Sequence, residues 1–217
     1  MNCPICGSPP KNEKLFTTCA FTKSVLERSE CTGCGLIFGP EYMIFATPDR
    51  VKSEYERLYA NYDEGDTTCY NIQTFNDIKP SKEGIYLDYG CGRWSKSIKI
   101  LVEDGYRVYG YEPYVLSDNN LILNDLSGCK FDGLFSHNVI EHFQDPIVAF
   151  ENFYNLLRPD GIMAHSTPCY NYKYIESQFH IYFYTGKSVE NLCSRTGFKL
   201  LEWKDYDDYR CCIFKKL

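Results

Sequence analysis

From about Gly84 to the C-terminus, short apolar runs alternate with amphipathic segments of helical length. The runs IYLDYG, YRVYGYEP, NLILND, FDGLFSHNVIEHF and IMAHSTP predict strands, and FKLLEWKDY with YRCCIFKK predicts a closing pair. Between them, SKSIKILVEDG, DPIVAFENFYNLLRPDG and GKSVENLCSRTG predict helices, the second with Pro in its first turn and Gly at its end. This alternation predicts an α/β fold, a mostly parallel sheet with helices on both faces.

The first 82 residues carry two other patterns. Within residues 1–40, the stretches EKLFTTCAF and SVLER predict a hairpin of short strands. Within residues 41–82, apolar positions recur at helical spacing opposite a charged face, at Val51, Tyr55, Leu58 and Tyr59. They predict a helix of about three turns, which either forms a lid over the main domain or only covers its core. We therefore expect a small module over 1–40, a helical connector over 41–82 and the main domain over 83–217.

Four of the twelve cysteines form two tight pairs, each a C-x-x-C followed by glycine: Cys3 with Cys6, and Cys31 with Cys34. Such a turn directs two thiolates at one metal ion, and the following glycine permits the positive φ that the turn often needs. Two turns complete a zinc-ribbon-like site with no vacancy for water, so the predicted role of the zinc is structural. Reduced cysteines in a small core are the alternative. Cys19 has no partner at ligand spacing and is expected to be a buried or free thiol.

Charge and hydropathy limit what the chain binds. The formal net charge of −6 argues against an enzyme with an extensive nucleic-acid-binding face. No apolar run approaches the roughly 18 residues that a membrane span needs, and the N-terminus MNCPICGSPPKNEK lacks a signal-peptide apolar stretch. We expect a cytoplasmic protein without a membrane partner.

A glycine turn follows the first predicted strand of the main domain, in IYLDYGCGRWS. In such a sheet, ligands bind outside the carboxyl ends of the strands, where Asp88, Gly90 and Gly92 are expected. Glu112 ends the next strand, 112 − 92 = 20 residues after Gly92, and a carboxylate there can accept both ribose hydroxyls. Ser95 takes the third glycine place of a dinucleotide fingerprint, and Asp88 would repel a phosphate. An acidic residue before the glycines suits a cationic nucleoside, and S-adenosylmethionine (SAM) fits.

The main domain resembles the class I SAM-dependent methyltransferases of the small-molecule type, whose sheet is Rossmann-like. LDYGCGRWS resembles the first motif of that family, YGYEP the second, FDGLFSHNVIEHFQDP the fourth-strand signature, and LLRPDGIMAHSTP the helix and strand that follow. HIYFYTGKSVENLCSRTGF is similar to a late stretch of the family. The double C-x-x-C head resembles that of a subset associated with methylation of sugars or other small metabolites. The resemblance implies SAM as cofactor, bound by Asp88, Gly90, Cys91, Gly92, Glu112, Asp125 and Asn138.

Details of this resemblance leave alternatives open. Asp125 follows the third strand as a candidate for the adenine amino group, and an exposed turn aspartate is the other interpretation. Trp94 replaces the usual third glycine of the first motif, and we expect it to wall the pocket rather than to block it. The gap between Glu112 and LILND is short, so the helix usual there is expected to be reduced.

Methyl transfer to a hydroxyl requires a base, and histidine has the pKa for it. Of the four histidines, His180 precedes IYFY and lies where the resemblance places the substrate-side loop, so it is the preferred candidate, followed by His142. For each, a structural, hydrogen-bonded histidine is the alternative. His137 is expected near the methionine portion of SAM, and His165 faces either core or crevice. Alternating tyrosines predict an aromatic substrate wall or an ordinary surface loop: Tyr170, Tyr172 and Tyr174.

The leading hypothesis is SAM-dependent methyl transfer to a small metabolite, such as a nucleotide-linked sugar or a glycan precursor. A ribosomal RNA base methyltransferase with a zinc module is the second, and a basic stripe across module and crevice would distinguish it. A non-catalytic methyltransferase-like protein whose zinc module recruits a partner is the third. SAM binding would weaken that third hypothesis, and turnover would exclude it.

Overall fold

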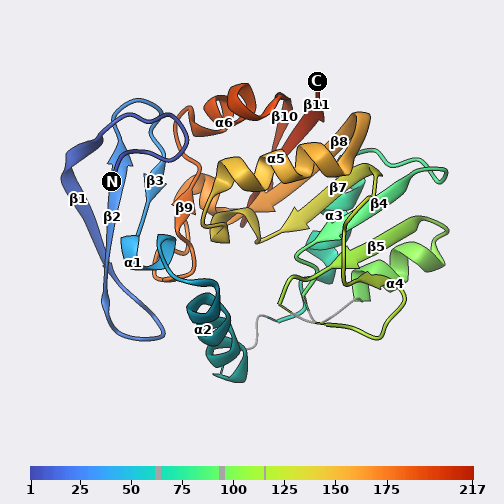
Figure 1. The fold of residues 1–217 in the computed structure, drawn as a ribbon, viewed down its shortest axis with the longest axis horizontal. Helices are drawn as coiled ribbons and strands as arrows, with labels where there is room; N and C mark the ends of the chain where they lie inside the picture. Colours follow the sequence, from blue (N-terminus) through green and yellow to red (C-terminus); the bar gives the residue numbers. More distant parts are fainter. Residues whose placement is uncertain (62–64, 93–95, 115) are drawn as a thin grey trace.

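The computed structural model describes residues 1–61, 65–92, 96–114 and 116–217, and it contains two sheets (Figure 1). The larger sheet has seven strands in the order β10-β11-β8-β7-β4-β5-β6. Five are mutually parallel: β8 (Leu157–Thr167), β7 (Phe131–His137), β4 (Ile85–Tyr89), β5 (Arg107–Tyr111) and β6 (Ile122–Leu123). The closing pair, β10 (Phe198–Asp205) and β11 (Arg210–Lys216), joins through β11, which runs antiparallel to β8. The predicted mostly parallel sheet is confirmed.

Helices cover both faces of this sheet, as the alternating pattern predicted. Successive strand residues point to opposite faces, so Leu134 and Phe135 of β7 belong to different core clusters. Phe135 packs with side chains of α3 (Thr68–Asp77) and α4 (Lys96–Glu103). Leu134 shares the other cluster with residues of α5 (Pro146–Leu156) and α6 (Ser188–Thr196).

The smaller sheet combines the N-terminal module with a strand from the far end of the chain. The predicted hairpin forms from β1 (Pro10–Thr18) and β2 (Val25–Cys31), and β3 (Ile37–Phe38) pairs with β2. The fourth strand, β9 (Tyr182–Phe183), pairs antiparallel with β3. The two sheets also share a core cluster that contains Ile5 and Leu36 as well as Leu134. The module is therefore completed by a segment that sequence pattern assigned to the main domain.

The connector contains three helices, where the sequence predicted one. These are α1 (Glu41–Ile44), α2 (Pro48–Asn61) and α3; the predicted helix corresponds to α2. The sequence analysis did not predict α3, because the stretch 68–77 is largely polar. Its buried Phe75 packs against the sheet. Among the described residues, no helix has the length and apolar character of a membrane span.

One boundary differs from the sequence expectation. The predicted helix over DPIVAFENFYNLLRPDG ends at Leu156, and β8 starts at Leu157, before the glycine that was expected to terminate the helix. Pro159 explains the difference, because proline disfavours helical geometry in the residue before it and donates no backbone hydrogen bond. At the other end, Asp145 caps α5 by accepting from the amides of Ile147 and Val148.

Candidate active site

A cavity of about 1000 Å³ lies at the carboxyl ends of β4, β5 and β7. Two groups of lining residues define its ends for the description below. The glycine side consists of Gly90, Cys91, Gly92, Glu112 and Asn138, and the aromatic side consists of Phe21, Tyr55, His142, Tyr174 and His180. Its volume lies at the upper end of the roughly 300–1000 Å³ that is usual for small-molecule sites.

The glycine side is built by the turn that ends β4. Gly90 and Gly92 have φ angles of 74° and 66°, in the left-handed region that favours glycine. The Gly90 amide donates to the Tyr111 carbonyl at 2.8 Å, which fixes the turn to the end of β5. A Cβ atom on Gly90 would lie 2.6 Å from Cγ2 of Val139, so both conformation and space require glycine here.

Glu112 is held against this turn, as the 20-residue spacing led us to expect. Its Oε2 accepts from the Gly92 amide at 3.2 Å, and its Oε1 accepts from the Tyr114 amide at 3.3 Å. At the end of β7, Asn138 has a φ of 55°, and its amide donates to the Ser166 carbonyl. Cys91 also lines the cavity, and burial raises the pKa of its thiol, which keeps it uncharged. Five predicted cofactor residues are thus brought together: Gly90, Cys91, Gly92, Glu112 and Asn138.

Two predicted cofactor residues do not line the cavity. Asp88 is buried beneath the turn, and neither carboxylate oxygen has a hydrogen bond of normal geometry to the described residues. Burial, followed by the charge of Glu112, raises the pKa of Asp88 to about 8. Asp125 is exposed and closes a turn by accepting from the amide and hydroxyl of Ser127 at 2.9 and 2.8 Å. A contact of Asp125 with adenine stays a prediction that this geometry does not support. Trp94 and Ser95 lie outside the described residues.

On the aromatic side, His142 and His180 lie together, with ring centroids 5.1 Å apart. Nδ1 of His142 is 2.8 Å from the Phe179 carbonyl oxygen, and Nδ1 of His180 is 3.0 Å from that of Tyr174. A carbonyl oxygen only accepts, so each Nδ1 carries a proton. In the neutral form of His180 the lone pair is therefore on Nε2. Burial lowers the pKa of His180 to about 3, with the charge of His142 adding to the effect. His180 is therefore neutral at physiological pH.

The remaining histidines differ in their surroundings. His165 is fully buried, with Nδ1 2.7 Å from the Ser136 hydroxyl and its ring stacked on Phe153. It belongs to the core. His137 lines the cavity at the end of β7, where its ring stacks on Tyr70 at 5.1 Å, and burial lowers its pKa to about 4.

Most aromatic lining residues escaped the sequence analysis. Of the alternating tyrosines, Tyr174 lines the cavity, whereas Tyr170 is buried against Trp203 and Tyr172 packs on Phe183. Tyr55 of α2 also lines the cavity, with its ring stacked on Tyr114 at 5.5 Å. The helical pattern of α2 identified Tyr55 as a packing residue, but it did not show what the ring would face.

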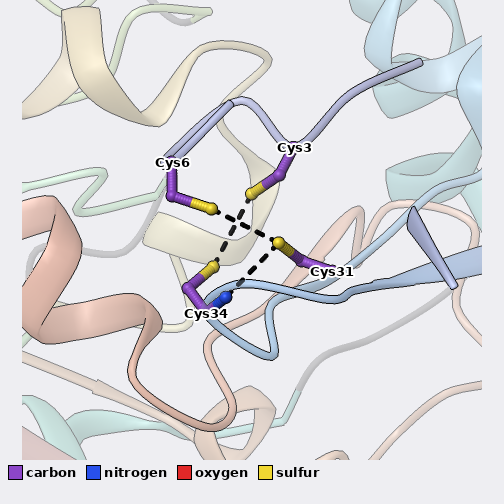
Figure 2. Close-up of side chains that lie close together, drawn as sticks. All are labelled: Cys3, Cys6, Cys31 and Cys34. Carbon is purple, nitrogen blue, oxygen red and sulfur yellow. Dashed lines mark hydrogen bonds between the residues drawn. The ribbon is translucent and has the colours of Figure 1, made fainter. Parts of the chain in front are cut away.

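The four predicted metal ligands converge in the N-terminal module (Figure 2). The Sγ atoms of Cys3 and Cys34 are 3.7 Å apart, and those of Cys6 and Cys31 are 3.3 Å apart. A tetrahedral zinc site with Zn–S bonds of about 2.3 Å places its sulfurs about 3.8 Å from one another. The amides of Gly33 and Cys34 point at Sγ of Cys31, at 3.3 and 3.4 Å, as suits a thiolate. The cluster fits a zinc ion, and Cys19 is buried away from it as a free thiol.

A profile of the family described as "Methyltransferase domain" matches residues 62–202 of this chain. The chain belongs to this methyltransferase family. The family match covers the strands and the turn that build the glycine side, so the resemblance identified from the motifs is confirmed. None of the curated proteins matches the chain.

Solved structures with the same fold are distant in sequence. The 1,6-didemethyltoxoflavin N1-methyltransferase of Burkholderia thailandensis, with bound 1,6-didemethyltoxoflavin and S-adenosylhomocysteine, is 13% identical, with 92% of this chain and 99% of that chain covered and a TM-score of 0.61. CalO1, a methyltransferase in calicheamicin biosynthesis, is 12% identical, with 82% of this chain and 65% of that chain covered and a TM-score of 0.57. The cyclase SpnF is 12% identical, with 78% of this chain and 96% of that chain covered and a TM-score of 0.57. These likenesses show the fold alone.

Proposed function

We propose that this methyltransferase transfers the methyl group of SAM to a small-molecule acceptor. The observation that carries the proposal is the turn at Gly90 and Gly92, held to the Glu112 carboxylate at the edge of the cavity. The turn lets a ligand approach the backbone closely, and the carboxylate would accept the ribose hydroxyls. When bound, SAM supplies an electrophilic methyl group on a sulfonium centre.

The neighbouring residues fit the methionine and acceptor ends of such a ligand. Asn138 and His137 would lie near the methionine portion, because both line the cavity at the end of β7, beside the glycine turn. The aromatic side would hold the acceptor and exclude water from it. Holding donor and acceptor in line accounts for much of the catalysis of a displacement.

We propose His180 as the base that removes the proton of a hydroxyl acceptor, with His142 as the second candidate. In both rings Nδ1 is bonded to a carbonyl oxygen, which leaves Nε2 as the nitrogen that could accept a proton, and both residues line the cavity. The acceptor oxygen would form its bond to the methyl carbon as its proton moves to that nitrogen.

The acceptor class that we propose is a sugar or glycan precursor, including nucleotide-linked sugars. Aromatic rings suit the apolar faces of a sugar ring. Among the described lining residues, Lys96 is the one Lys or Arg, and it is paired with Asp66, whereas Glu176 and Asp208 also line the cavity and have no ion pair with a described residue. This charge balance favours entry of an uncharged part of the acceptor and disfavours a nucleic-acid backbone.

We further propose that Cys3, Cys6, Cys31 and Cys34 hold a structural zinc ion. Four thiolates leave no open coordination position, so the ion would supply folding free energy rather than reaction chemistry.

Calorimetric titration of the protein with SAM, with NAD as the control ligand, tests the proposal. We expect saturable binding of SAM only, followed by release of S-adenosylhomocysteine when sugar nucleotides and free sugars are offered. Binding of NAD instead would overturn the cofactor assignment. SAM binding without turnover on any acceptor would favour a non-catalytic, partner-recruiting protein, and turnover on ribosomal RNA alone would favour the nucleic-acid hypothesis.

A further inference from the structure

A cationic side chain of the N-terminal module is buried where the module meets the aromatic side. Arg28, on β2, is 1% exposed. Its Nη2 donates to the carbonyl oxygen of Ser177 at 2.9 Å and lies 3.4 Å from that of His180. Its guanidinium carbon is 4.9 Å from the ring centroid of Phe183 in β9. Nε and Nη1 have no hydrogen-bond partner among the described residues.

The surroundings of Arg28 do not neutralise its charge. The titratable groups that act on it are the weak acids Tyr172, Cys169, Tyr42 and Cys19, and burial lowers its pKa. Burying a cation without a carboxylate costs free energy, and an apolar side chain of similar volume would pack there at lower cost. Fold stability therefore does not account for an arginine at this position. Its contacts with the Ser177 and His180 carbonyl groups point to a functional role.

These contacts fix the segment that carries His180. Nη2 of Arg28 reaches two carbonyl groups, one three residues before His180 and one of His180 itself. The His180 ring is held from the other direction, because its Nδ1 donates to the Tyr174 carbonyl within the same segment. Directly afterwards, β9 pairs with β3 of the module. The module thus holds this segment through the β3–β9 pairing, the Arg28 guanidinium group, and backbone hydrogen bonds such as that from the Ala20 amide to the Glu176 carbonyl at 2.9 Å.

We propose that Arg28 is a positioning residue for methyl transfer, which holds the 177–180 segment so that Nε2 of His180 faces the acceptor. This inference rests on the proposed role of His180 as base. It gives the cysteine module a part in catalysis, because Arg28 lies on β2, whose last residue is Cys31.

The charge of Arg28 would also act on the protonation of His180. The groups that face His180 are Arg28 from β2, His142 from the turn after β7, Glu141 beside it, and the Tyr174 carbonyl of its own segment. Burial, His142 and Arg28 lower the pKa of His180, and the carbonyl raises it. Replacing Arg28 by a neutral residue should therefore raise this pKa and move the acidic limb of the pH–rate profile to higher pH.

The test compares Arg28→Met, Arg28→Lys and the control Lys11→Met. Lys11 lies on β1 and pairs with the half-buried Glu30, so its replacement removes a charge from the module without touching the 177–180 segment. We expect Arg28→Met to lower kcat about 100-fold, as small misplacements of reacting groups do, with SAM affinity unchanged. Arg28→Lys should keep the pKa of His180 low, because the positive charge is retained. Its kcat should fall about 10-fold, because a flexible ammonium group replaces the planar guanidinium group. Lys11→Met should behave as the unchanged protein.

The pKa of His180, measured by NMR in each variant, separates this inference from the proposed function. A raised pKa with lowered kcat supports the inference. An unchanged kcat and an unchanged His180 pKa in folded Arg28→Met would overturn it; if that variant does not fold, full kcat in Arg28→Lys would do so. A third outcome is a raised His180 pKa in Arg28→Met together with full activity of His180→Ala. Arg28 would then act on His180, but another group would be the base. That outcome would overturn both the assignment of the base and the role of Arg28 in methyl transfer.

Discussion

The two sides of the cavity are assembled in different ways. The glycine side comes from the ends of adjacent parallel strands, and four of its five residues lie within a 23-residue stretch from Gly90 to Glu112, with Asn138 as the exception. The aromatic side gathers side chains from the β1–β2 turn, α2, the turn after β7 and the 174–180 segment, which span most of the chain. A side built from one local unit can be recognised by motif, and a side built from distant segments cannot. The same difference predicts that damage to the N-terminal module will spare SAM binding and remove turnover.

The largest effect is expected from the cysteine cluster. Cys31→Ser removes one of four ligands, which should lower the free energy of unfolding of the module by about 3 kcal/mol or more and abolish stoichiometric zinc binding. Since β9 pairs with β3, turnover should fall with it while the Kd for SAM changes little. Metal analysis, thermal melting and calorimetry measure the three quantities. The control is Cys69→Ser, which replaces an exposed cysteine of α3. Loss of SAM binding in Cys31→Ser would show that the two sides are not separable.

The next effect concerns the proposed base. His180→Ala should lower kcat by about 10²- to 10⁴-fold, the usual contribution of a positioned base, without changing the Kd for SAM. His142→Ala should cost less if His180 is the base and more if the roles are exchanged. Steady-state kinetics at saturating SAM decide between them. Full turnover in both variants would contradict the assignment of either histidine.

On the glycine side, Gly90→Ala should weaken SAM binding by about 10-fold or more. The new Cβ meets Val139 at 2.6 Å, and alanine is strained at a φ of 74°. Gly128→Ala is the matched control, because Gly128 has a φ of 75° with open space around its Cβ position. Equal losses of affinity in the two variants would mean that backbone strain, and not the close contact at the cofactor turn, sets the effect.

The smallest effect is a pH dependence of stability that comes from Asp88. The pKa of Asp88 is raised from 3.8 to about 8 in the folded protein, chiefly by burial. The folded state therefore binds this proton more tightly than the unfolded state, and stability falls as pH rises from about 4 to 8. Asp88→Asn has no proton to lose. At pH 8 it should therefore have a higher melting temperature than the original protein and a free energy of unfolding larger by about 1 kcal/mol or more. Near pH 4 the two proteins should match. The control Asp125→Asn replaces an exposed carboxylate whose pKa is lowered by the Ser127 amide and should show no gain at pH 8. A pH-independent difference for Asp88→Asn would refute the linkage.

Sequence pattern predicted the strands of the larger sheet and the cysteine pairs that cluster in the N-terminal module. It also pointed to five residues that line the cavity, among the seven proposed to bind the cofactor. Most of these features depend on short-range spacing. It misjudged features that depend on what surrounds a residue. Asp88 has the position of a ligand-facing acid but lies beneath the turn, and Tyr170 sits in a tyrosine-rich loop but is buried against Trp203. Alternation along the chain does not state which neighbour covers a side chain.

By itself the sequence determined the α/β architecture, the family and the two cysteine pairs that cluster, since hydrophobic periodicity and motif spacing act over a few residues. Only the tertiary structure decided that β9 completes the sheet of the N-terminal module, that His142 and His180 face each other, and that Arg28 reaches the His180 segment from 152 residues away in the chain. These contacts form because burial of apolar surface brings the two sheets into one core, and no local pattern records which distant residues will meet there.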